Sequence, residues 1–211
     1  MEWRSRAARG DVYIVRYADD FVVGFQHRDD AERCLAEMRA RFARFGLDVH
    51  SEKTRLIEFG RFASENRARR GEGKPETFAF LGFTHRCGKR WSDGRFTVQR
   101  QSLAQRLRAK VKEVREWLKA HRHDPVPALG RWLRSVVRGY FNYHAVPGNR
   151  QALWIFQKEA SRAWLWALRH RSQKGRSLSW DRMRRLLRTW LPRPSILHPY
   201  PDVRFHARHP R

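Results

Sequence analysis

The hydrophobic periodicity of the 211-residue sequence changes near residue 100, and this change limits the folds that the chain can adopt. Before it, short apolar runs such as VYIVRY (12–17) and FVVGFQ (21–26) have the length and the residue types of strands. After it, leucines and valines recur every three or four residues, as they do on one face of a helix. The sequence therefore predicts an α+β protein, with strands in the first half and only helices in the second.

The first half is predicted to hold a hairpin, one helix and further strands. The hairpin strands are almost wholly apolar, so we expect both of their faces to be covered. Asp29 and Glu32 form an acidic version of a capping box, and Gly46 supplies a C-terminal stop. The polar segment 60–76 is predicted to be a loop. The predicted elements are strands at 12–17, 21–26, 54–59, 77–85 and 94–100, with a helix at 29–45.

The second half is predicted to be a helical bundle. Its first helix has an apolar stripe at Leu103, Leu107, Val111, Val114 and Leu118. A second helix is predicted from Asp124–Pro125 to about His144, a third from about Asn149, and a shorter fourth at 177–191 that Ser179 caps. Residues 192–211 hold five of the nine prolines, which predicts an extended or disordered tail.

The chain is strongly basic, with a formal net charge of +25. Residues 1–100 contain 21 basic and 15 acidic side chains, whereas residues 101–211 contain 25 and 6. Such a charge favours a polyanionic partner, with nucleic acid first and an anionic membrane surface second. Nine tryptophans accompany it, and we expect most of them to lie in the core.

Two other features narrow the class of protein. Cys34 and Cys87 are too few for a disulfide framework or a cysteine zinc site. No apolar run is long enough to span a membrane, and residues 1–10 do not resemble a secretory signal. We therefore expect a cytoplasmic protein with no membrane partner.

Asp19 and Asp20 are adjacent carboxylates at the predicted bend of the hairpin. Like charges this close repel each other, and a divalent cation removes the penalty. Mg²⁺ prefers carboxylate oxygens, and substrate phosphates commonly complete its coordination shell. Two such ions can stabilise the attacking and leaving oxygens of a phosphoryl transfer. A solvated turn is the alternative interpretation of the dipeptide taken alone.

The residues around this pair resemble those of a known family. YADD between apolar strands resembles the polymerase motif of reverse transcriptases, and FGLDVHSEKTRLIEFG (45–60) and FAFLGF (78–83) resemble segments that follow it. WLRSVVRGYFNYHAVPGN (132–149) resembles the maturase-specific thumb region of group II intron enzymes. The resemblance implies a partial palm at 1–98, a basic thumb or maturase bundle at 99–191 and a tail at 192–211.

The resemblance also implies roles for individual residues. Asp19 and Asp20 would be the catalytic carboxylates and the Mg²⁺ ligands of RNA-directed DNA synthesis. Lys53 would lie near the incoming triphosphate, with plain surface charge as the alternative. Strand packing is the alternative for Leu81, whereas close backbone approach explains Gly82 better. The nucleotide- and primer-binding residues implied are Tyr17, Ala18, Lys53, Leu81, Gly82 and Phe83.

The basic bundle implies a second set of contacts. Lysines and arginines along the first thumb helix could follow backbone phosphates, which gives an affinity that falls with salt. The partners implied are structured intron RNA, an RNA/DNA primer-template and deoxynucleotides. The expected RNA-binding residues are Arg106, Arg108, Lys110, Lys112, Arg115, Lys119, Arg134 and Arg138.

The sequence departs from the family at its front. Family members carry fingers and an early palm before the hairpin, with a further metal-binding aspartate, whereas ten residues precede Asp11 here. Asp11 lies at the far end of the hairpin and cannot easily replace that ligand. We therefore expect an incomplete two-metal site, an exposed apolar sheet edge and a truncated or split reverse transcriptase. A separate chain carrying fingers and early palm is then a candidate partner.

Three functions stay open at this point. One is an RNA-directed DNA polymerase with maturase activity, and the second is a non-catalytic maturase fragment that assists intron splicing. The third is a nonfunctional remnant of a mobile element. Zinc-binding DNA modules and HNH-type nucleases find no support, because the tail lacks cysteine pairs and ligand spacing.

Overall fold

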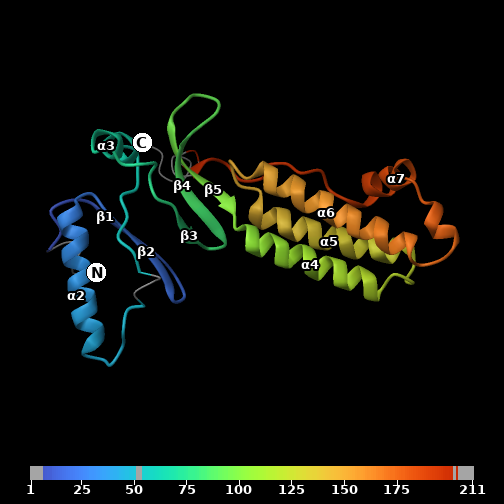
Figure 1. The fold of residues 1–211 in the computed structure, drawn as a ribbon, viewed down its shortest axis with the longest axis horizontal. Coiled ribbons are helices and arrows are strands. Elements are labelled where there is room, and N and C mark those ends of the chain that lie inside the picture. Colours follow the sequence, from blue (N-terminus) through green and yellow to red (C-terminus); the bar gives the residue numbers. More distant parts are fainter. Residues whose placement is uncertain (1–6, 51–53, 202, 204–211) are drawn as a thin grey trace. The chain divides into compact units, whose positions relative to one another are not determined.

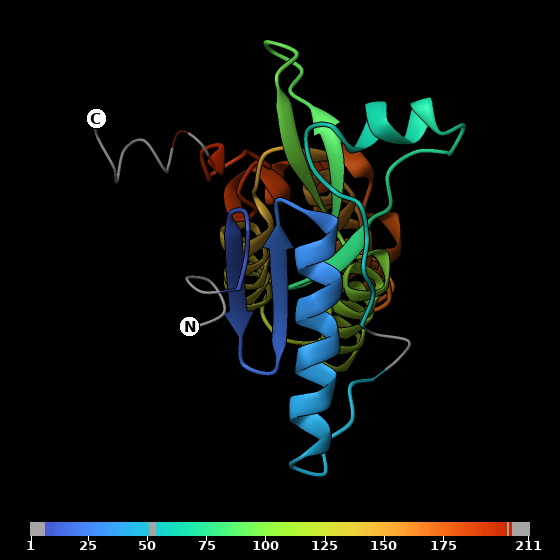
Figure 2. The ribbon, with the colours of Figure 1, turned by 90° about the vertical axis from the view of Figure 1, so that its left-hand side faces the viewer.

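A hairpin and one helix form the first of two units in the computed structural model, which describes residues 7–50, 54–201 and 203. Strands β1 (Val12–Tyr17) and β2 (Asp20–Phe25) pair antiparallel, with Val12 opposite Phe25 and Tyr17 opposite Asp20. Helix α2 (Arg28–Ala43) follows and contacts β2 (Figure 2). The unit spans Met1–Phe59 and confirms the predicted hairpin and helix.

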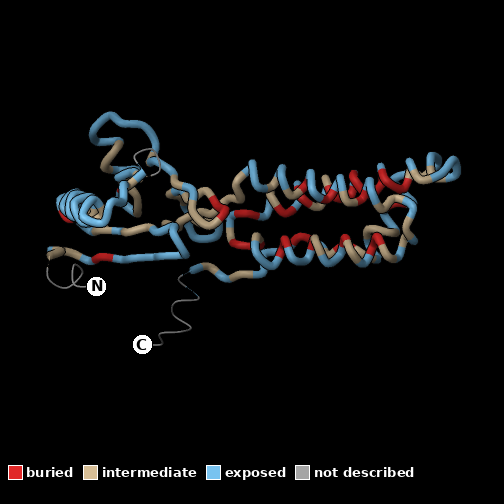
Figure 3. The backbone as a smooth tube through the Cα atoms, turned by 90° about the horizontal axis from the view of Figure 1, so that it is seen from below, coloured by how far each residue is buried: buried red, intermediate tan, exposed pale blue. Residues whose placement is uncertain are grey.

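The hairpin is far more exposed than its apolar sequence predicts. Tyr13, Ile14 and Tyr17 are 62%, 56% and 66% exposed, and Val12 is the buried residue of β1 (Figure 3). The expectation that both faces are covered is therefore wrong. A sheet of two strands with one helix beside it cannot cover its second face, and it leaves the apolar edge that was expected.

The first turn of α2 differs from the predicted capping box. The helix begins at Arg28, His27 is its N-cap, and no side chain caps it. Asp30 is instead buried, where its Oδ2 accepts hydrogen bonds from the backbone N–H of Arg9 (2.9 Å) and Gly10 (3.2 Å). Burial raises the pKa of Asp30, but these bonds and the Arg33 side chain outweigh it and hold the pKa below its usual value.

The predictions for residues 54–76 are wrong in two places. Residues 54–59 form no strand, because the strand-like sequence has no neighbour with which to pair in the two-stranded sheet. The segment predicted as a loop contains helix α3 (Ala63–Arg69). Its N-cap, Phe62, supplies no side-chain hydrogen bond, and Ala63 is its buried residue.

The second unit, Gly60–Arg211, begins with a three-stranded antiparallel sheet of order β3-β4-β5. Its strands are β3 (Phe78–Phe80), β4 (Phe83–Lys89) and β5 (Phe96–Ser102). Residues 77–85 are thus not one strand as predicted, because the chain turns at Leu81–Gly82 and pairs Phe80 with Phe83. The predicted hairpin partner at 94–100 is confirmed as β5.

The predicted helical bundle is confirmed. It consists of α4 (Ala104–Ala120), α5 (Val126–His144), α6 (Arg150–Arg169), a short 3₁₀ turn at Lys174–Ser177 and α7 (Trp180–Trp190) (Figure 1). Ser179 caps α7 as predicted, since its hydroxyl accepts a bond from the N–H of Arg182 (3.4 Å). None of the described helices is both long and apolar enough to cross a membrane.

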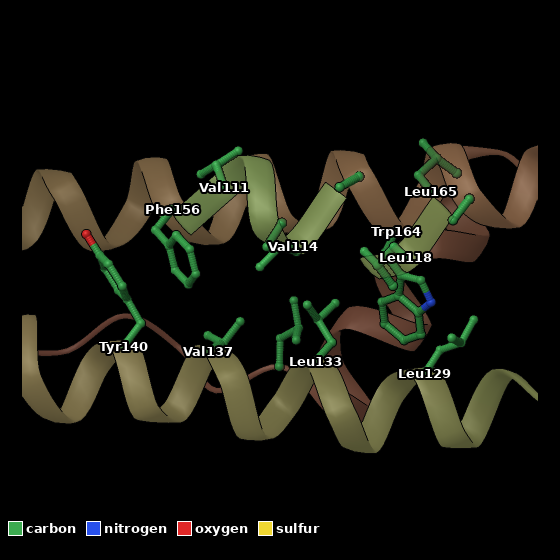
Figure 4. Packing of buried hydrophobic residues seen from close by; sticks show 14 of the residues in the cluster. Val111, Val114, Leu118, Leu129, Leu133, Val137, Tyr140, Phe156, Trp164 and Leu165 are labelled. Carbon is green, nitrogen blue, oxygen red and sulfur yellow. The ribbon is translucent and has the colours of Figure 1, made fainter. Parts of the chain in front are cut away.

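The core of the bundle lies between α4, α5 and α6 (Figure 4). Val114 and Leu118 of the predicted stripe are fully buried. The largest fully buried side chains of the described residues are Trp164 and Phe156. Tyr140 stacks on Phe156 with ring centroids 3.9 Å apart. The expectation that most tryptophans are core is wrong for the described residues, since Trp91, Trp154, Trp166 and Trp180 are exposed.

The first part of the proline-rich tail is attached to the bundle. The N–H groups of Leu197 and His198 both donate to the carbonyl oxygen of Ala145, at 3.0 and 3.1 Å. His198 Nε2 lies 2.7 Å from the carbonyl of Asn142. Residues 192–200 form no helix or strand, in keeping with the prediction. In the structure, β3–β5 belong to the same unit as the helices. The expected domain boundaries at 98 and 191 stay a prediction.

Candidate functional site

The tip of the first hairpin is a two-residue turn of Ala18 and Asp19. Ala18 has a φ of 50°, in the left-handed region that residues with a Cβ rarely adopt. The side chain of Arg16 holds this turn, because its Nε donates to the carbonyl oxygen of Ala18 at 2.9 Å. The local sequence thus fixes the backbone from which both candidate carboxylates project.

Asp19 and Asp20 are both exposed. Within the described part of the chain, neither carboxylate has a hydrogen bond or an ion pair. Tyr17, which is opposite Asp20 in the ladder, is also exposed. The two carboxylates are therefore accessible to a cation or a substrate, and whether they face a common cleft stays a prediction.

The carboxylate pair fits part of a Mg²⁺ site. Carboxylate oxygens are ligands of the right kind, and the ion can keep waters in its other positions. Residues 7–50, 54–201 and 203 contain no group of three or more His, Cys, Asp or Glu side chains placed to hold a metal. Asp11 pairs with Gln26 at the open end of the hairpin, as expected. The described residues thus supply two carboxylates, and they do not supply a complete two-ion site.

The Leu81–Gly82 turn, predicted to support a primer, is fastened to the helical bundle. The hydroxyl of Tyr143 donates to the carbonyl of Leu81 (2.8 Å), and the N–H of Leu103 donates to that of Gly82 (3.0 Å). Gly82 has a φ of 78°, and a Cβ there would lie 3.1 Å from Arg106. The neighbour of Gly82 is thus a side chain, and the close backbone approach predicted there stays a prediction. Lys53 lies outside the described residues.

A polar network next to this turn could not be identified from the sequence. Ser102 Oγ lies 2.8 Å from His144 Nδ1 and accepts from Asn149 Nδ2 at 2.8 Å. Asn149 Oδ1 accepts from the N–H of Ser102 (2.9 Å). Burial, helped by the charge of Arg106, lowers the pKa of His144 to about 4. The network joins the end of β5 to the end of α5 and the start of α6.

The predicted RNA-binding residues lie on α4 and α5, and all except Lys110 are exposed. Three of the α4 cations have acidic partners: Lys110 bonds Glu113, Lys112 lies 3.9 Å from Glu116, and Arg115 pairs with Glu159. In the part of the chain that is described, the others have no ion pair, namely Arg106, Arg108, Lys119, Arg134 and Arg138.

Helix α5 carries one basic residue that the sequence analysis missed. Arg131 is exposed and has no acidic partner among the described residues. It precedes Arg134 by three positions and Arg138 by seven, so the three side chains share one face of the helix. The same spacing was visible in the sequence and could have identified it.

The described residues thus offer two features that could take charged ligands: an exposed carboxylate pair on a hairpin, which could take a divalent cation, and exposed cations on a helical bundle, which could take a polyanion. Residues 1–85 match the family described as reverse transcriptase (RNA-dependent DNA polymerase). The match includes Asp19, Asp20 and the Leu81–Gly82 turn, and it ends before α4. No curated protein matches the chain significantly.

Proposed function

We propose that this chain is a reverse transcriptase and maturase component of the group II intron type, whose helical bundle binds structured RNA. The observation that carries the proposal is the set of exposed cations on α4 and α5 that lack acidic partners among the described residues. The match of residues 1–85 to the reverse transcriptase family supports the choice of nucleic acid as the partner.

The electrostatic reason is that a surface cation without an acidic partner is free to neutralise a phosphate. Each phosphate that a protein neutralises releases condensed counterions, so binding weakens as salt rises. Residues 101–211 contain 25 basic and 6 acidic side chains, far more cations than the internal ion pairs can use. The exposed arginines of α5 are suited to phosphates and to stacking on unpaired bases.

The hairpin supplies the chemical part of the proposal. Asp19 and Asp20 would hold Mg²⁺, which, when bound, polarises the phosphoryl oxygens and activates the attacking hydroxyl. The Arg16 bond to the Ala18 carbonyl keeps the turn in place, so the two carboxylates are presented from a fixed backbone. Tyr17 would contact the nucleotide or the primer end from the same tip.

A non-catalytic RNA-binding maturase fragment is the second candidate. The observation that favours it is that the described residues bring no third metal ligand to Asp19 and Asp20. In that case the bundle would stabilise folded intron RNA while the carboxylate pair stays without a complete metal site. Both candidates share the RNA surface, and they differ in whether the chain contributes to nucleotide transfer.

Filter binding of a folded RNA across a salt series tests the shared part. Arg134→Gln with Arg138→Gln should make the slope of log K against log salt shallower by about 1.5. The matched control, Arg67→Gln with Arg70→Gln, removes the same charge from arginines that already contact Glu72, and it should leave the slope unchanged. If the slope becomes shallower by the same amount in both variants, or if the wild type does not bind RNA at low salt, the proposal is contradicted.

A further inference from the structure

A groove of about 450 Å³ opens between α4 and α6 in the second unit. Arg115, Glu116 and Lys119 of α4 line one side, and Glu159, Arg162 and Trp166 of α6 line the other. The two helices pack directly on each other below it. The groove is thus formed by two helices that contact each other, and its lining combines an aromatic ring with charged groups.

Trp166 is held in a fixed orientation at this groove. His170 stacks on one face of the indole, with ring centroids 4.2 Å apart and the planes 22° from parallel. His170 Nδ1 also lies 2.8 Å from the carbonyl oxygen of Trp166, so this nitrogen carries the proton and donates it. Trp166 is nevertheless 42% exposed.

The end of α4 contains the same arrangement with one difference. His121 stacks on Trp117 at 4.0 Å, and its Nδ1 lies 2.9 Å from the Trp117 carbonyl. The second face of Trp117 is covered by Trp132, whose ring centroid is 3.6 Å away and nearly parallel. Among the described residues, Trp166 has no ring other than His170 against it. No aromatic ring of the described residues takes at Trp166 the place that Trp132 takes at Trp117, and Trp166 lines the groove with 42% of its surface exposed.

The charges around the groove suit an anionic ligand with a flat ring. Glu159 is mostly buried and is neutralised by Arg115 and by Arg162, the latter at 3.0 Å. The second lining carboxylate, Glu116, has Lys112 as its partner at 3.9 Å, so the three cations of the lining outnumber its two acids. Lys119 has no ion pair in the part of the chain that the structure describes. An ammonium group without a partner near an open indole face offers one contact for a phosphate and one for a base.

We propose that the groove between α4 and α6 binds an unpaired nucleotide of RNA, with its base stacked on the open face of Trp166 and a phosphate near Lys119. This inference rests on the proposed RNA-binding function and assigns to it a preference for unpaired over paired nucleotides. A base inside a duplex keeps both of its faces in the stack, so it cannot use this surface.

The test compares two RNAs of equal length and charge, one a perfect duplex and one with unpaired adenosines. Trp166→Leu should weaken binding of the second RNA about tenfold, as expected for one lost base–aromatic stack, and change duplex binding less than twofold. Trp154→Leu is the matched control, because Trp154 lies on the same helix, is 50% exposed and does not line the groove. It should change neither affinity by more than about twofold.

A fluorescent base reports the contact directly. With 2-aminopurine in place of the unpaired adenosine, stacking on Trp166 should quench its emission in the wild type and in Trp154→Leu, and not in Trp166→Leu. Equal losses in the two variants, or equal losses on the two RNAs, would overturn this inference and leave the RNA-binding proposal standing. Failure of the wild type to bind either RNA would overturn both.

Discussion

Ser102 Oγ and His144 Nδ1 lie 2.8 Å apart and join the last residue of β5 to the last turn of α5. Since Asn149 donates to the same hydroxyl, Ser102 can donate its proton to His144. This bond requires the neutral imidazole with an unprotonated Nδ1. A second proton on His144 would reverse this bond and would place a positive charge in a partly buried site beside Arg106.

The free energy of unfolding should therefore depend on pH. The pKa of His144 is lowered from 6.5 to about 4, so between these values the unfolded chain binds more protons. Stability should be full above pH 6.5 and fall as the pH decreases toward 4. The shift corresponds to about 3 kcal/mol, which screening at a partly exposed ring reduces to about 1–2 kcal/mol.

Urea unfolding at a series of pH values checks this expectation. His144→Gln should be less stable at pH 7.5 and should lose less stability on acidification than the wild type. His85, whose pKa burial also lowers, is present in both proteins and cancels in the comparison. Equal pH dependence in the two proteins would contradict the role assigned to His144.

Two glycines of α5 should respond to alanine in opposite directions. A Cβ on Gly130 would lie 2.5 Å from the indole of Trp190, the part-buried last residue of α7. A Cβ on Gly139 would meet nothing within 4 Å. Gly139→Ala should stabilise the bundle by about 0.5–1 kcal/mol through helix propensity. Gly130→Ala should destabilise it by about 1–3 kcal/mol through overpacking.

Thermal and urea unfolding of both variants measure this pair. The residues share a helix and a substitution, so the difference between them isolates the contact with Trp190. A stabilising Gly130→Ala would show that α7 can move away from α5 at little cost.

The carboxylate pair leads to a prediction about catalysis. Transfer that uses two metal ions needs ligands that fix both ions, and the described residues bring only Asp19 and Asp20 to the hairpin tip. We expect the chain alone not to extend a primer on an RNA template. A second chain carrying fingers and early palm should restore extension.

Primer extension with Mg²⁺ distinguishes these cases. Asp19→Ala with Asp20→Ala should lower the restored rate by about three orders of magnitude or more. Asp11→Ala is a suitable control, because Asp11 lies at the other end of the hairpin. Robust extension by the lone chain that the double variant abolishes would mean that another of its residues completes the site.

Much of the architecture could be predicted because periodicity reflects burial. The stripe through Val114 and Leu118 is the buried face of α4, and the two apolar runs on either side of Asp19 form a hairpin. The errors occur where the structure of a segment depends on whether another segment lies beside it. Residues 54–59 have strand-like composition and no strand beside them, and a strand without a neighbour has no ladder.

The candidate site divides in the same way. Asp19 and Asp20 could be identified because they are adjacent in sequence, whereas the left-handed turn at Gly82 lies inside a segment that was predicted as one strand. The Ser102–His144 contact spans 42 positions, and the open face of Trp166 depends on the absence of a neighbour such as Trp132. Neither leaves a local pattern, so only the fold reveals them.

Because the tail is attached to the bundle, the stability of the C-terminal end of α5 depends on an intact chain near residue 194, some fifty positions later. Ala145 is fully buried, and the carbonyl that it presents is capped by Leu197 and His198. A protease cut between α7 and these residues would release the cap and leave a buried acceptor that costs about 1–3 kcal/mol. Clipping at this segment should therefore loosen the junction of α5 and α6 before any helix is cut, which makes limited proteolysis a sensitive measure of the state of the bundle.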